Sequence, residues 1–161
     1  MSADARFEDA RVFSEVPLRL KAETPDDLSV MSALVQDAVA QTSEMAWARK
    51  HRRFTMLLNR FRWEDAPAAE REGRSFERVR AILAVDSVLK ARTSGVDPRD
   101  RDLVLELLAV AFEPGEDGGG TLRLILAGDG EIALEVECLD VRLADVTRPY
   151  LARSRPQHPD R

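Results

Sequence analysis

Only one segment of the 161-residue chain has the apolar spacing of an α-helix, and this limits the possible folds more than any other feature. Within residues 24–41, apolar side chains recur at intervals of three and four: Leu28, Met31, Leu34, Val35, Ala38 and Val39. Thr24 can cap the helix, Pro25 suits the first helical position, and Asp27 completes a capping box. The sequence therefore predicts one main helix over about residues 25–40.

The remaining apolar residues alternate with a period of two, which is typical of half-buried strands. A change of parity near Ser87 predicts one bent strand or two strands over residues 78–95, and residues 64–75 are predicted to form the longest internal loop. Further strands and hairpins are predicted in residues 16–22, 45–58, 121–127 and 131–143. Residues 103–114 fit either a buried strand or a short helix, and their Val, Leu and Phe content favours the strand. The predicted fold class is α+β: a largely antiparallel sheet of about six to eight strands with one main α-helix packed on it.

Two segments resemble each other within the chain. Residues 20–34 and 89–108 share an LKA-x-T opening, an acid-rich turn and an apolar run, and each precedes a predicted hairpin. Two explanations of this similarity are open: the domain consists of two pseudo-repeated strand–connector–hairpin units, or the similarity arose by chance. The length suits a single domain, which we assign to residues 16–150, between a flexible N-terminal arm (1–15) and a flexible C-terminal tail (151–161).

Composition excludes several classes of protein. A formal net charge of −5 argues against a general nucleic-acid binder. The single cysteine, Cys138, cannot form an intramolecular disulfide or a thiolate zinc site by itself. The first residues lack the apolar core of a signal peptide, and no apolar run is long enough to cross a membrane. We therefore expect a cytoplasmic protein without membrane association.

Catalytic motifs are scarce. A serine or cysteine nucleophile usually needs a histidine base, and the only histidines are His51, in a basic turn, and His158, near the end of the chain. The GDG sequence at 128–130 suits a tight turn and lacks the ligand spacing of a calcium loop. We predict no cofactor and no metal, and an enzyme without a cofactor motif is our third hypothesis.

Charge is unevenly distributed along the chain. Between Met45 and Trp63 there is no acid but there are six basic residues: Arg49, Lys50, Arg52, Arg53, Arg60 and Arg62. From Asp102 to Thr147 there are eleven acids and two arginines. Such asymmetry favours steering of a charged partner or pairing of copies. Alternatively, basic and acidic strands of one sheet neutralise each other.

Arginine and aromatic side chains occupy neighbouring positions near the end of the basic segment, a combination that is common in protein interfaces and in RNA-binding surfaces. Our first hypothesis is a non-catalytic binding or adaptor module that acts through a protein partner or self-association. The second is an RNA-binding module that uses the basic and aromatic hairpin at residues 47–63. The candidate binding residues are Gln36, Asp37, Trp47, Arg53, Asn59, Arg60, Arg62 and Trp63.

Several segments resemble one bacterial family. These are LVQDAV (34–39), MAW (45–47), RRFTMLLNRFRWE (52–64), LAVAFEPGE (108–116) and EIALEVECLDVRLADV (131–146). Over roughly residues 17–150 the chain is similar to the family known as domain of unknown function 2948. The resemblance implies no particular activity and no catalytic residues.

Overall fold

The computed structural model describes residues 16–153, 155 and 156. The predicted N-terminal arm (1–15) lies outside these residues, as do positions 154 and 157–161 of the predicted tail. The helices are α2 (Pro25–Val35) and α3 (Ala66–Glu72), with short 3-10 turns at Thr42–Glu44 and Arg49–His51. The strands are β1 (Arg19–Ala22), β2 (Ala38–Gln41), β3 (Met45–Ala48), β4 (Arg53–Phe61), β5 (Glu77–Val85), β6 (Val88–Ser94), β7 (Val104–Pro114), β8 (Gly120–Leu126), β9 (Glu131–Val136), β10 (Val141–Asp145) and β11 (Tyr150–Leu151).

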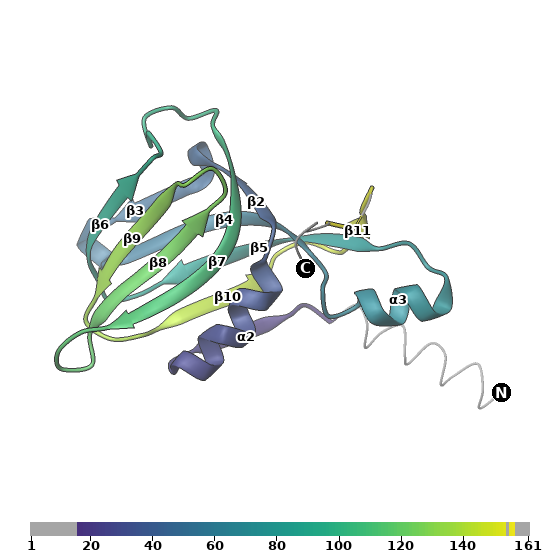
Figure 1. Ribbon diagram of the computed structural model, residues 1–161, viewed down its shortest axis with the longest axis horizontal. Coiled ribbons are helices and arrows are strands. Elements are labelled where there is room, and N and C mark those ends of the chain that lie inside the picture. The colour runs from purple at the N-terminus through teal and green to yellow at the C-terminus, as the bar shows by residue number, and fades with distance from the viewer. Residues whose placement is uncertain (1–15, 154, 157–161) are drawn as a thin grey trace.

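All strands join one antiparallel sheet, in the order β1-β10-β5-β4-β2-β7-β8-β9-β6, with β3 beside β4 and β11 beside β5. The sheet is strongly curled, so that β7, β8 and β9 lie in front of β3, β4 and β5 in Figure 1. Strand β2 pairs with both β4 and β7 and thereby links the two halves. The predicted α+β class with a largely antiparallel sheet is confirmed, whereas the predicted number of about six to eight strands is too low, since the described residues form a sheet of 11 strands.

The two halves of the sheet enclose a hydrophobic core. Alternate residues of each strand point inward, including Met56, Leu58 and Leu83 from one half and Leu122, Leu124 and Leu134 from the other. Helix α2 packs against β7 and β1 and adds Leu28, Met31 and Val35 to the same core. Each fully buried side chain of this kind stabilises the fold by about 1.5–3 kcal/mol.

The start of α2 follows the predicted capping box, since the Thr24 hydroxyl accepts a hydrogen bond from the Asp27 amide, and the Asp27 carboxylate accepts one from the Thr24 amide. The predicted helix end at residue 40 is wrong. The helix stops at Val35, Asp37 adopts a left-handed conformation with φ 63°, and β2 begins at once. Apolar residues at 35, 38 and 39 fit both periods, and pairing of β2 with β7 decides between them.

Other local predictions met mixed outcomes. The hairpin of β3 and β4, the strand at β7 and the hairpin of β8 and β9 are confirmed. Residues 78–95 form two strands, β5 and β6, and the break lies at Ser87, where φ is 60°. The loop predicted for 64–75 is wrong, because α3 forms within it with a proline in its first turn and ends at Gly73 in the left-handed conformation.

The two similar segments of the sequence fold differently. Residues 20–34 form the end of β1 and most of α2, whereas residues 89–108 form most of β6, a connecting loop and the start of β7. Strands β1 and β6 nevertheless lie at opposite ends of the strand order. At the C-terminal side, Leu151 pairs with Glu77 in the sheet, so the first residue of the predicted tail belongs to a strand.

Candidate functional site

Arg60, one of the six basic residues between Met45 and Trp63, is buried inside the protein. Arg60 is the last inward-facing residue of β4, and its side chain is 0% exposed. Its guanidinium donates two hydrogen bonds of 3.0 Å to Asp145 and two of 2.8 and 2.7 Å to Glu64. A planar guanidinium matches two carboxylates in this way, so Arg60 forms a neutralised cluster at one end of the core.

Proton affinities in this cluster follow from the pairing. Burial acts to lower the pKa of Arg60, but the hydrogen bonds to Glu64 and Asp145 outweigh burial and raise the pKa above its usual value. Burial likewise acts to raise the pKa of Glu64, yet the hydrogen bond and positive charge of Arg60 hold that pKa below its ordinary value of 4.5. Both Arg60 and Glu64 are therefore charged at neutral pH.

Most of the other arginines in the segment are also paired. Arg62 is 8% exposed and donates a hydrogen bond to Glu77. Arg52 and Arg53 lie at the surface but contact Glu137 at 2.8 Å and Asp86 at 2.7 Å. The hypothesis of a single exposed basic patch is wrong for Arg60 and Arg62, because neither guanidinium is accessible to a phosphate chain.

The acidic second half of the chain supplies partners across the sheet. Arg52 pairs with Glu137 of the segment after β9, and Arg92 of β6 pairs with Glu135 of β9. Arg123 of β8 contacts both Glu113 and Glu131 at 2.9 Å. Two ion pairs, Arg52–Glu137 and Arg60–Asp145, join the basic segment to the acidic second half, so part of the charge asymmetry in the sequence is neutralised between strands.

The two tryptophans have structural contacts. The indole nitrogen of Trp63 donates a 2.9 Å hydrogen bond to the carbonyl oxygen of Gln36, the residue that follows α2. Its ring lies 4.6 Å from that of Phe61, centroid to centroid. Trp47 is half-buried and packs against the core. Trp63 thus satisfies one of the carbonyl groups that a helix leaves free at its C-terminal end.

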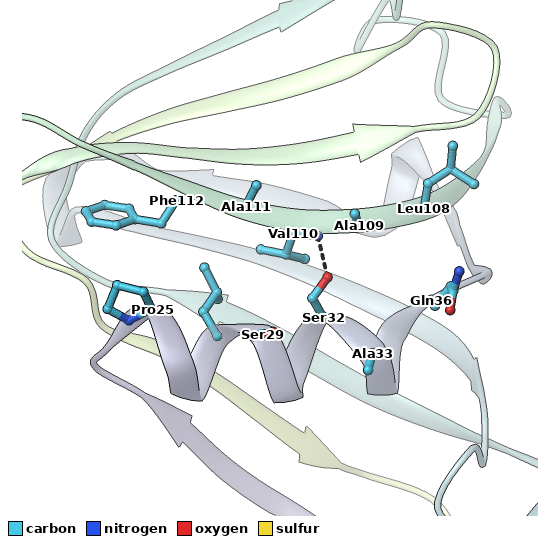
Figure 2. A pocket seen from close by; sticks show the side chains of 11 residues that line it. Pro25, Ser29, Ser32, Ala33, Gln36, Leu108, Ala109, Val110, Ala111 and Phe112 are labelled. Atoms are coloured by element: carbon cyan, nitrogen blue, oxygen red, sulfur yellow. Dashed lines mark hydrogen bonds between the residues drawn. The ribbon is translucent and has the colours of Figure 1, made fainter.

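A groove runs along the seam between α2 and β7 and has a volume of about 420 Å³. Figure 2 shows the helix below the strand, with Ser32 reaching up to Val110 and Pro25 lying near Phe112 at one end. The walls carry small side chains, among them Ser29 and Ala33 from the helix. The strand wall carries Ala109 and Ala111 beside the larger Leu108, Val110 and Phe112.

The strand wall of this groove is a partly open edge. Strand β7 pairs with β2 only from Val104 to Leu107, and a bulge at Leu108 shifts its register against β8. Beyond Leu107, no other strand in the described part of the chain pairs with the α2 side of β7. Ser32 accepts a 2.9 Å hydrogen bond from the Val110 amide. Since alternate residues direct their main-chain groups to the same side, Phe112 presents its own amide and carbonyl to the groove.

Gln36 and Asn59, two of the eight predicted binding residues, line different hollows. Gln36 borders the α2–β7 groove, whereas Asn59 borders a second hollow between β2 and β4. Asp37 is 3% exposed and its amide donates to the Leu107 carbonyl, which fixes the turn into β2. The structure therefore does not bring the eight residues together into one site.

Sequence reasoning missed the helix wall of the groove. Ser29, Ser32 and Ala33 of α2 lie beside the core-facing row of Leu28 and Met31, and Leu28 lines the groove as well. A stripe of small residues beside the core-facing row of an amphipathic helix is a visible signal of close approach by another chain. The bulge at Leu108 has no comparable signal in the sequence.

Other kinds of site find little support in the described part of the chain. Among residues 16–153, 155 and 156, no group of three or more His, Cys, Asp or Glu side chains is arranged to hold a metal ion. None of the helices there combines the length and the apolar character needed to cross a membrane.

Comparison with known proteins gives one match. Residues 18–158 match the model of the family described as Protein of unknown function (DUF2948). Neither the curated proteins nor the solved structures gave a match. Because the matched region covers most of the 161 residues, from β1 to the end of the described sheet, the chain is a member of the DUF2948 family.

Proposed function

We propose that this protein is a non-catalytic binding module that takes up an extended segment of a partner protein in the α2–β7 groove. The observation that carries the proposal is the edge of β7 from Leu108 to Phe112, with which no strand in the described part of the chain pairs on the α2 side and whose Val110 amide donates to Ser32. A five-residue edge of this kind is about 15 Å long, enough for a short extended peptide.

The chemistry of the groove favours a peptide over other ligands. An extended peptide offers alternating amide and carbonyl groups, which can pair with those of Phe112 and with the Val110 carbonyl. Ser29, Ser32 and Ala33 leave room for a second main chain beside the strand. The groove lining includes no arginine or lysine, so the groove gives no reason to expect a phosphate chain.

Blocking the groove tests the proposal. Ala33 is exposed on the groove wall, and Val30, 60% exposed on the same helix, lies outside the groove lining. Ala33→Arg places a long charged side chain in the groove, and Val30→Arg is the matched control. We expect wild type and Val30→Arg to retain a specific partner from lysate and Ala33→Arg to lose it.

Hydrogen exchange provides the second measurement. With the purified partner bound, the Phe112 amide should exchange more slowly, because an added strand would accept its hydrogen bond. Light scattering on the chain alone distinguishes a separate partner from self-association. Equal retention by the two variants, or a strictly monomeric protein that retains no partner, would contradict the proposal.

A further inference from the structure

A second hollow, separate from the groove, lies on the outer face of the sheet between β2 and β4 and has a volume of about 300 Å³. Its apolar lining includes Val39, Leu57 and the exposed Val104. Its polar lining consists of Gln41, Glu44, Asn59 and Arg80. None of these residues belongs to the lining of the α2–β7 groove. The two sites can therefore be tested independently.

The hollow arises from the way the strands divide. Strand β2 pairs with β4 at Val39 and Asn59 only, and then continues along β7. Strand β3 takes over as the neighbour of β4 from the pair of Met45 and Met56 onward. Between these two contacts, Leu57 has no pairing neighbour on that side in the described part of the chain. The sheet itself thus creates an opening with an apolar floor.

Opposite charges border this opening without being paired. Arg80 lies across from Asn59 in the β4–β5 ladder, and Glu44 precedes the first residue of β3. Within the described part of the chain, neither Arg80 nor Glu44 has an ion-pair partner. This contrasts with the arginines of β4, which all contact carboxylates.

Asn59 adds a buried polar group with an unmet hydrogen bond. Its side-chain oxygen Oδ1 is buried and has no hydrogen-bond partner among the described residues. A buried acceptor left in this state is unfavourable, because it has lost its hydrogen bonds to water without gaining another. Asn59 lines the hollow, so its amide lies beside any ligand held there. A ligand with both donors and acceptors would satisfy it.

We propose that this hollow binds a free α-amino acid with an aliphatic side chain. Its carboxylate would pair with the Arg80 guanidinium, its ammonium group with the Glu44 carboxylate, and its side chain would lie on Val39 and Leu57. The Asn59 amide hydrogen-bonds to the polar end of the ligand. With strands about 4.8 Å apart and a rise of about 3.3 Å per residue, the Cα atoms of Glu44 and Arg80 lie roughly 12 Å apart. Two long side chains can close this distance around an amino acid.

Three probes separate the charges of the ligand. L-Leucine has both charges, N-acetyl-L-leucine retains only the carboxylate and L-leucinamide retains only the ammonium group. In titrations followed by two-dimensional ¹H–¹⁵N NMR, we expect saturable shifts of the Asn59 side-chain amide with L-leucine. The two blocked forms should bind about tenfold to a hundredfold more weakly, since each lacks one charged hydrogen-bonding group. Absence of saturable shifts with L-leucine, or equal binding of all three probes, would overturn the proposal.

Variants of the chain complete the test. Arg80→Gln and Glu44→Gln alter exposed side chains, so both proteins should fold, and each should weaken L-leucine binding at least about tenfold. Arg142→Gln is the matched control, because Arg142 lies on β10 outside the hollow. It should bind L-leucine as the wild type does. Equal weakening by Arg142→Gln would show a general charge effect and overturn the assignment to this hollow.

Discussion

The two faces of the β4–β5 ribbon differ in whether their polar side chains have partners within the protein. On the inner face, Arg60 is 0% exposed and its hydrogen bonds are met by Glu64 and Asp145. On the outer face, one residue earlier in the chain, the Asn59 side-chain oxygen has no hydrogen-bond partner among the described residues. Asn59 lies across the ladder from Arg80, which has no ion-pair partner among the same residues. The inner charges complete the fold, and the outer ones remain available to a ligand.

The burial of the side chain distinguishes two kinds of arginine in this sheet. A buried guanidinium costs several kcal/mol of solvation unless carboxylates compensate it, so Arg60 is effective only with its partners in place. An exposed arginine costs almost nothing when unpaired, so Arg80 can remain free for a ligand. Position in the strand, inward or outward, separates the two roles, although both residues are arginines in similar sequence surroundings.

The largest expected effect comes from breaking the inner cluster. Arg60→Met removes the cation and leaves Glu64 and Asp145 without compensation, and we expect a loss of about 3–5 kcal/mol in the free energy of unfolding. Urea denaturation followed by circular dichroism measures this loss. Arg80→Gln, on the outer face, is the comparison and should change the same quantity by less than about 0.5 kcal/mol. Similar losses in both variants would remove the distinction between the faces.

Acid should weaken the same cluster through Glu64. The pKa of Glu64 is depressed in the folded protein, so the stability it contributes is present above its unfolded pKa near 4.5 and is lost as pH falls through the folded pKa. Glu64→Gln lacks this contribution and should be less stable than wild type by about 1.5–3 kcal/mol at pH 7. The difference in unfolding free energy should shrink below about pH 4.5. A difference that stays constant from pH 7 to pH 3 would contradict this assignment.

Replacing Asn59 should have a smaller effect of opposite sign. Asn59→Leu removes the unmet buried oxygen while keeping the size of the side chain, and should raise the free energy of unfolding by about 1 kcal/mol. The same variant should bind L-leucine more weakly. A protein that is more stable but binds less well would support a role for Asn59 in binding, whereas a less stable protein would show that its amide serves the fold.

A small effect is expected for an exposed pair that includes Arg53, on the outer face of β4. Arg53 contacts Asp86 at 2.7 Å, but its side chain is 53% exposed. Arg53→Gln should lower the free energy of unfolding by less than about 1 kcal/mol, and added salt should reduce the difference. Urea denaturation at low and high salt measures both. A loss as large as that of Arg60→Met would show that pairing alone, without burial, sets the contribution.

Much of the fold could be predicted because apolar periodicity is a local signal. The capping box at Thr24 and Asp27 and the alternation along β4 and β8 each lie within a few residues of the chain. The end of α2 could not be predicted in this way. Ala38 and Val39 fit a helix as well as a strand, and their strand conformation depends on β7, far away in sequence.

The candidate sites were harder to predict because pairing partners lie far apart in the chain. The partner of Arg60 on β10 is 85 residues away, so neither its burial nor its neutralisation is visible locally. Arg80 was not predicted as a binding residue, because it lies in a predicted strand outside the basic segment. Asn59 was identified, but only as a neighbour of arginines and aromatics, and its register opposite Arg80 came from the structure.

The most direct test of the distinction between the two faces is to measure two properties of Arg80→Gln in parallel. We expect the affinity of Arg80→Gln for L-leucine to fall at least about tenfold, while its free energy of unfolding stays within about 0.5 kcal/mol of wild type. A variant with unchanged affinity and a clear loss of stability would contradict the account, because the outer arginine would then serve the fold as the inner one does.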